Sequence, residues 1–210
     1  MREIKAFDFE VRAEQNEEYG HFITGQPIVY GTATELYNPA RGKRIKEIIE
    51  DGALAETDLR DVRFLINHNT NMIPLARSRN NNDNSTMQMK VIEGDGMYIR
   101  VNLDTENNSD AKSLYSAVER GDITGMSFMF TDVKEEWEGV RSELPVRHIR
   151  SIGHVLEVSA VTFPAYETTS IQSRGLSDAL DSAWESLDSE EAKLKEIDRQ
   201  KQKIKILLEV

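Results

Sequence analysis

The chain has 210 residues, of which 39% are hydrophobic and 30% charged, as is typical of a globular domain with a polar surface. The net charge of −11 argues against a nucleic-acid partner, because phosphate binding needs a surplus of lysine and arginine. The lack of cysteine excludes thiol nucleophiles, thiolate metal sites and disulfides, and no apolar run is long enough for a transmembrane helix or an export signal.

The N-terminal half of the chain predicts mainly short strands. Alternating or continuous apolar segments between turn residues have this pattern, and they cover residues 4–12, 26–33, 61–66, 72–76, 87–92 and 97–103. The last two segments flank the turn sequence EGDG, which predicts an antiparallel meander. Residues 45–55 are ambiguous, because their isoleucines fit a helix whereas Gly52 interrupts it.

The C-terminal half begins with the clearest helix, residues 109–120. Ser109 can cap its first turn, and Gly121 follows where a helix ends. The apolar stripe of this helix consists of Ala111, Leu114, Tyr115 and Val118. Residues 147–163 supply the longest strand, which ends before Pro164 because proline cannot donate to a sheet ladder.

These elements predict one α+β domain that is rich in strands and covers residues 1–172. From Leu176 onward glycine and proline disappear, and apolar residues recur close to heptad spacing with interruptions. We therefore expect residues 173–210 to form a helical tail with a coiled-coil pattern. It should depend on a partner, because such a helix is marginal alone.

Residues 121–130, GDITGMSFMF, are an apolar run with a single hydroxyl, Ser127. In a strand, Met126, Phe128 and Phe130 share one face and Ser127 lies on the other. Gly125 beside it lets another backbone come close, which suits a nucleophile that meets an extended peptide. The alternative is a strand serine whose hydroxyl bonds to a neighbouring carbonyl.

A serine nucleophile needs a base and a group that orients the base. His68 is the strongest candidate base, because it follows an apolar strand in an asparagine-rich turn; the alternative is a surface histidine. Glu157 is the preferred third member, since a carboxylate within the apolar run HVLEVSAVTF is costly unless it is paired. His154 competes for this role. The alternatives for Glu157 are an exposed residue on an edge strand and a residue paired with Arg147 or Arg150.

Other chemistries have less support. The sequence has no H-E-x-x-H motif, no phosphate-binding glycine loop and no G-x-S-x-G motif. A zinc site would need His68, His148, His154 and a carboxylate to converge, which nothing in their spacing requires. We therefore expect no metal and no cofactor.

Three segments in this order, LINHNTNMIPLAR, RGDITGMSFMF and LEVSAVTFPAY, resemble the caudoviral prohead proteases, the maturation proteases of tailed phages. The resemblance covers roughly residues 4–172 and includes the approach segment IIEDGALAETDLRDV. That family is regarded as a distant relative of the herpesvirus assemblins. The resemblance thus implies an antiparallel β-barrel surrounded by helices, with a serine and a histidine on barrel strands.

The same resemblance implies roles for individual residues. The family's nucleophile falls on Ser127, its base on His68, and the third position in the strand that holds Glu157. Assemblins use a histidine as the third member, so His154 stays an alternative. The chain departs from the usual motif at Asn69, where aspartate is common, and at Ala76, where glycine is common.

The function implied is that of a serine endopeptidase that cuts the major capsid protein and scaffolding segments, and itself, inside the procapsid in the host cytoplasm. Arg77 is a candidate for supporting the oxyanion donors. The exposed linker at residues 172–177 is a candidate self-cleavage region. The tail at residues 173–210 is a candidate docking helix. No nucleic acid or membrane is expected, and a homo-oligomer is left open. The alternatives are a non-enzymatic assembly or scaffolding protein and a different hydrolase, such as an esterase.

Overall fold

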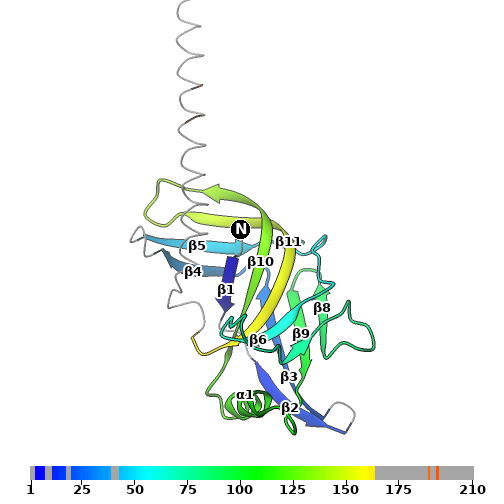
Figure 1. Cartoon of the computed structure of the whole chain (residues 1–210). Coiled ribbons are helices and arrows are strands. Elements are labelled where there is room, and N and C mark those ends of the chain that lie inside the picture. Colours follow the sequence, from blue (N-terminus) through cyan, green and yellow to red (C-terminus); the bar gives the residue numbers. More distant parts are fainter. Residues whose placement is uncertain are drawn as a thin grey trace, which may run out of the picture.

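The computed structural model describes residues 3–7, 11–17, 20–38, 43–163, 189 and 193 (Figure 1). Within these ranges the chain forms two β-sheets and a single α-helix. The elements are β1 (Glu3–Phe7), β2 (Arg12–Asn16), β3 (Gly20–Val29), β4 (Ala33–Asn38), β5 (Lys43–Ile49), β6 (Arg63–Ile66), β7 (Ala76–Arg77), β8 (Met87–Ile92), β9 (Gly96–Asn102), α1 (Ser109–Glu119), β10 (Gly125–Glu138) and β11 (Val146–Val161). No helix in the described part is long and apolar enough to cross a membrane.

The larger sheet is organised around the long antiparallel pair β10 and β11, which curves through the molecule (Figure 1). Its strand order is β1-β10-β11-β5-β4, and β6 with β7 adds to β11. One end of β11 pairs in parallel with β5, and the other end pairs in parallel with β6. β11 therefore joins β5 and β6, two strands from separate parts of the N-terminal half of the chain.

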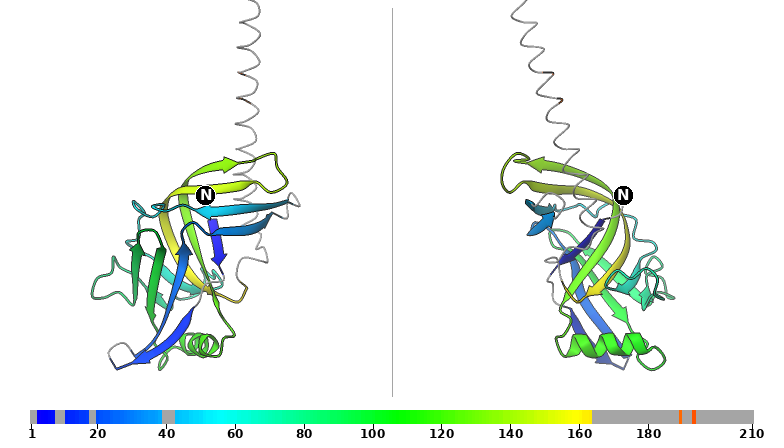
Figure 2. Two further views of the ribbon diagram at one scale, coloured as in Figure 1. Left: turned by 180° about the vertical axis from the view of Figure 1, so that it is seen from behind. Right: turned by 60° about the vertical axis from the view of Figure 1, so that its left-hand side comes forward.

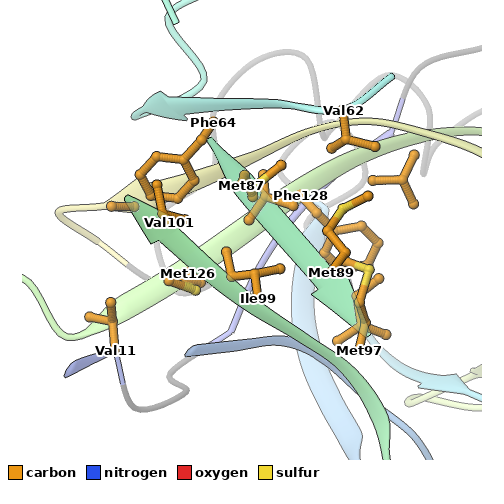
Figure 3. Packing of buried hydrophobic residues seen from close by; sticks show 14 of the residues in the cluster. Val11, Val62, Phe64, Met87, Met89, Met97, Ile99, Val101, Met126 and Phe128 are labelled. Atoms are coloured by element: carbon orange, nitrogen blue, oxygen red, sulfur yellow. The ribbon is translucent and has the colours of Figure 1, made fainter. Parts of the chain in front are cut away.

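The smaller sheet is antiparallel, in the order β2-β3-β9-β8, and it includes the predicted meander of β8 and β9. Its inner face packs against the larger sheet, as Figure 3 shows for Met87, Ile99 and Val101 opposite Met126 and Phe128. All five side chains are buried. The core thus lies between the sheets, and it takes up the predicted apolar face of the serine strand.

The predicted helix is confirmed and begins at Ser109 as expected, but another residue caps it. Asn108, not Ser109, is the N-cap, because its side-chain oxygen accepts hydrogen bonds from the backbone N–H groups of Asp110 and Ala111. The helix buries Ala111, Leu114 and Val118. It packs beside β2 and β3 at one end of the molecule (Figure 2).

The predicted β-barrel surrounded by helices is wrong. The described residues form two open sheets, with β1 and β4 at the ends of the larger one, and one helix. The larger sheet ends at β1 and β4, which do not pair with each other, and β11 pairs in parallel with β5 and β6, so this sheet is neither closed nor purely antiparallel. The described part of the chain is therefore mostly β, and α1 gives it an α+β character.

The ambiguous segment at residues 45–55 contributes a strand, β5, which ends before Gly52. Its buried residues are Ile45, Glu47 and Ile49, so the period is two and not that of a helix. Gly52 follows in a turn with φ +79°, a backbone conformation that favours glycine. The predicted tail and the boundary at residue 172 lie outside the described residues, apart from Ser189 and Lys193.

Candidate active site

Ser127 lies on β10, on the face of the larger sheet that points away from the core. By strand alternation its side chain lies on the opposite face from those of Met126 and Phe128, which belong to the core cluster. The register places Ser127 opposite Ser159 of β11 and opposite Ala6 of β1. Ser127 is fully buried, and its Oγ has no hydrogen-bond partner in the described part of the chain. A buried hydroxyl without a partner is unusual, so this structure does not support the alternative of a serine bonded to a carbonyl.

Glu157 shares this face, because it lies two residues before Ser159 on β11. Its side chain is buried, with 3% exposure. One carboxylate oxygen, Oε1, lies 2.6 Å from Nδ1 of His68, and the other, Oε2, accepts a hydrogen bond of 2.5 Å from the Ser159 hydroxyl. Both oxygens of a buried carboxylate are thus occupied, as the cost of burying the charge demands.

His68 is presented by a turn with an uncommon backbone. Asn67 and His68 follow β6 with φ angles of 49° and 56°, in the left-handed region that asparagine enters more readily than most residues. The end of β11 holds this turn: the Asn67 N–H donates to the Ala160 carbonyl, and the His68 N–H donates to the Ser159 hydroxyl. The Asn67 side chain also exchanges two hydrogen bonds with Thr162.

The structure therefore brings together His68, Glu157 and Ser159, with Ser127 on the adjacent strand. Directly opposite residues of an antiparallel pair have Cβ atoms about 4.5–5.5 Å apart, which makes Ser127 and Ser159 neighbours. No hydrogen bond joins Ser127 to His68 in this structure. The arrangement is a histidine–carboxylate pair near a buried hydroxyl that makes no hydrogen bond to the described residues.

His154 lies elsewhere. Its ring contacts two carboxylates, with Nδ1 2.7 Å from Asp132 and Nε2 3.7 Å from Asp58. The hydrogen bond from His154 lowers the pKa of the Asp132 carboxyl. His154 is about half exposed, and in the described residues its ring makes no contact with His68 or Ser127. It belongs to a separate cluster at the surface.

The other arginine and histidine candidates also have partners of their own. Arg147 pairs with Glu47 and Glu135, Arg150 pairs with Glu136, and His148 pairs with Glu50. Neither arginine that the sequence offered to Glu157 therefore contacts it. Among the described residues, no group of three or more histidines and carboxylates is arranged to hold a metal ion.

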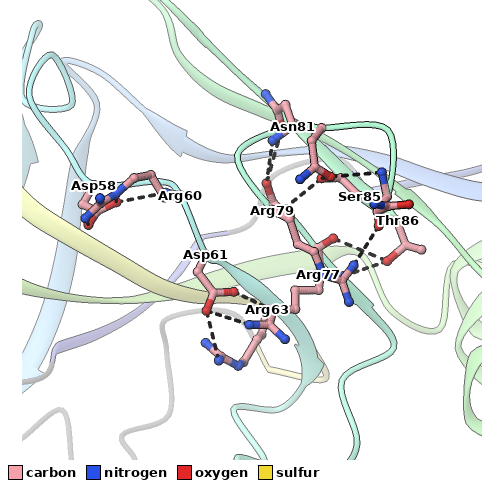
Figure 4. A network of polar contacts seen from close by, with 12 residues as sticks. Asp58, Arg60, Asp61, Arg63, Arg77, Arg79, Asn81, Ser85 and Thr86 are labelled. Atoms are coloured by element: carbon pink, nitrogen blue, oxygen red, sulfur yellow. Dashed lines mark hydrogen bonds and ion pairs between the residues drawn. The ribbon is translucent and has the colours of Figure 1, made fainter.

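Arg77 is engaged by Asp61. Its Nε and Nη2 donate hydrogen bonds of 2.6 Å and 2.8 Å to the two oxygens of Asp61, which also receives one from Arg63 (Figure 4). The hydrogen bond from Arg77 lowers the pKa of the Asp61 carboxyl. Arg77 thus ties β7 to the approach of β6, and it does not point its guanidinium at Ser127.

Sequence reasoning missed two residues of the site. Ser159 had a signal, because E-V-S in a strand places its hydroxyl on the same face as Glu157. Asn67 had a weaker one, as an asparagine that ends a strand and favours a left-handed backbone. Both contacts reach across more than ninety residues of chain, which local patterns do not show.

Comparison with known protein families matches residues 7–182 to the family described as caudovirus prohead serine protease. This range includes the whole candidate site and spans well over half of the chain. No curated protein and no solved structure matches the chain.

Proposed function

The chain belongs to the caudovirus prohead serine protease family, and we propose that it is the endopeptidase that cuts capsid and scaffolding proteins inside the procapsid during head maturation. In this proposal Ser127 is the nucleophile, His68 the general base and Glu157 the residue that orients the base. The observation that carries the assignment is the 2.6 Å contact between His68 Nδ1 and the buried Glu157, beside the strand that bears Ser127.

The contact defines how the histidine would act. A carboxylate accepts hydrogen bonds, so Glu157 accepts one from the Nδ1–H of His68, and Nε2 is left as the acceptor for the Ser127 proton. As the Ser127 oxygen bonds to the scissile carbonyl carbon, its proton passes to Nε2. Glu157 stabilises the imidazolium that forms, and the imidazolium then gives the proton to the leaving amine as the C–N bond breaks.

Water completes the reaction. It attacks the acyl-enzyme with His68 again as the base, and Ser127 recovers its proton when the C–O bond breaks. Before the first step, the buried Ser127 hydroxyl must turn toward Nε2, since the two groups are not hydrogen-bonded in this structure. Catalytic hydrogen bonds often close only when the substrate is bound.

The test is co-expression with the major capsid protein of the same genome, followed by mass spectrometry of all products. Wild-type protein should release defined fragments of the capsid protein and of its own chain, whereas Ser127→Ala should release none. Ser151→Ala, on the same sheet but away from the site, is the matched control and should cut normally. Near-normal cleavage by Ser127→Ala would refute the assignment.

A serine-reactive phosphonate probe separates the protease from a non-enzymatic assembly protein. The probe should label wild-type protein at Ser127, as located by peptide mapping, and should not label His68→Ala. Absence of labelling together with absence of cleavage would favour the assembly role. Turnover of small esters without peptide cleavage would instead favour an esterase.

A further inference from the structure

Ser159 occupies the centre of the candidate site. It is fully buried on β11 between two neighbouring strands, opposite Ser127 of β10 and opposite Leu65 of β6. Its hydroxyl lies on the face that carries Ser127 and Glu157. No role in the proposed proton transfer falls to this hydroxyl, although it contacts both partners of the histidine–carboxylate pair.

The direction of its two hydrogen bonds is fixed by chemistry. A backbone N–H can only donate, so the His68 N–H gives its proton to Ser159 Oγ at 3.1 Å. The hydroxyl has one proton of its own, and that proton goes to Glu157 Oε2 at 2.5 Å. Ser159 therefore accepts from the backbone of the base and donates to the carboxylate that orients the base.

This arrangement has two consequences for the site. The bond to Oε2 fixes the rotation of the carboxylate, so that Oε1 faces His68 Nδ1. The bond from the His68 N–H anchors a residue whose left-handed backbone, at φ 56°, needs support from its surroundings. The Ser159 hydroxyl thus positions His68 in two ways. It accepts a hydrogen bond from the His68 backbone N–H, and it fixes the carboxylate that contacts the imidazole ring.

We propose that Ser159 is a positioning residue of the protease, which holds Glu157 and His68 in the relative orientation that leaves Nε2 directed toward Ser127. It acts through these two residues and does not itself take part in bond making. The inference rests on the proposed function and adds a fourth residue, with a defined task, to the proposed Ser127, His68 and Glu157.

The test measures cleavage of a peptide taken from a mapped capsid site by three variants of the full chain. Ser159→Ala removes both hydrogen bonds and should lower kcat about 10- to 100-fold, with KM changed less than about threefold, because the substrate is still bound while the base is misaligned. Ser159→Cys keeps the size but has a weak donor, and should behave like Ser159→Ala. Ser159→Thr keeps the hydroxyl and should restore most of kcat.

Two readouts distinguish positioning from a merely structural role. In a Glu157→Gln background, Ser159→Ala should lower kcat by less than about threefold, because residues that act as a unit are not additive. The downfield proton NMR signal of the His68 Nδ1–H should weaken in Ser159→Ala and return in Ser159→Thr. Ser151→Ala, on the same strand, is the control and should leave kcat and the signal unchanged.

The outcomes separate the two proposals. Wild-type kcat in both Ser159→Ala and Ser159→Cys, with Ser127→Ala inactive, would overturn the role of Ser159 and leave the protease assignment intact. A full additional loss in the Glu157→Gln background would also overturn it. Cleavage by Ser127→Ala would instead refute the protease assignment itself. If Ser159→Ala does not fold, the comparison of Ser159→Cys with Ser159→Thr gives the same decision.

Discussion

Both ends of the β10–β11 pair contain a buried charged side chain, but the partners of the two side chains differ. Near Ser127, the carboxylate of Glu157 is matched with an imidazole and a hydroxyl. At the far end, the guanidinium of Arg147 is 1% exposed and donates to Glu47 at 2.9 Å and to Glu135 at 2.6 Å. The same two strands thus hold one cluster built on histidine and one built on arginine.

The difference is one of protonation. An arginine stays charged at any pH that the protein meets, so the far cluster keeps its cation, which ties β5, β10 and β11 together. A histidine gains and loses its proton near neutral pH, so the near cluster can pass a proton on. The far end is suited to holding the sheet, and the near end is suited to chemistry.

Replacing the histidine at each end by alanine should give the largest difference in peptide cleavage between the two ends. His68 and His148 each lie 2.6 Å from a carboxylate, but it is His68 that contacts Ser159, the residue opposite Ser127. His68→Ala should lower peptide cleavage roughly 10⁴-fold or more, and adding Ser127→Ala should change little further. His148→Ala should stay within a few-fold of wild type. Equal losses in steady-state kinetics would contradict the comparison.

Replacing a buried carboxylate at each end should give opposite results. Glu157→Gln should lower kcat by about 10- to 10⁴-fold, because an amide no longer orients the imidazole. Its effect on substrate binding should be smaller. Glu47→Gln should keep kcat but lower the melting temperature, because it weakens the arginine cluster. His154→Ala, the sequence's alternative third member, should change kcat less than about threefold. A larger loss from His154→Ala than from Glu157→Gln would reverse the assignment.

How far the sequence predicts the site can be seen at Glu157. The apolar run around it correctly indicates a buried charge that needs a partner, and strand alternation correctly puts Ser127 on the face opposite the core. The hydrogen-bond partners of the Asn67 turn and of the Ser159 hydroxyl are not predictable, because they depend on how β6 docks on β11. Two residues far apart in the sequence give no local signal of such docking.

The fold is harder to predict than the site for a related reason. Residues 45–55 look ambiguous because their isoleucines fit a helix whereas Gly52 interrupts it. Nothing nearby in the sequence indicates that Glu47 is buried, since its partner Arg147 lies one hundred positions later. The barrel expectation fails because the closure of a sheet depends on which distant strands pair. The parallel partners of β11 are set by tertiary packing, which overrides any local pattern.

The arginine cluster should dominate stability at the far end. Arg147→Met leaves two carboxylates without their shared cation and should lower the free energy of unfolding by about 3–5 kcal/mol, measured by urea denaturation. Arg150→Met removes an ion pair between a half-exposed arginine and the exposed Glu136. It should lower the free energy of unfolding by less than about 1 kcal/mol. Similar losses for both variants would show that burial of the pair does not matter.

The smallest effect is expected for Asp61 and Arg77, which join β6 to β7. The pKa of the Asp61 carboxyl is lowered in the folded state, so this ion pair stabilises the fold at pH values above the pKa that the carboxyl has in the unfolded chain. The stabilisation is lost as the pH falls through the pKa of the folded state. Because both side chains are well exposed, Arg77→Gln should cost less than about 1 kcal/mol at neutral pH. The difference between the variant and wild type should vanish in strongly acidic solution. A difference that persists there would assign the effect to packing.

The order of the strands along the chain has a consequence for protein synthesis. The ribosome releases β6 with His68 first, then β10 with Ser127, and β11 with Glu157 last. Since β6 and β10 meet through β11, a nascent chain that still lacks β11 has no scaffold between His68 and Ser127. Under the proposed function, proteolytic activity therefore appears only after β11 has been translated and docked, so a chain without β11 does not cut host or capsid proteins.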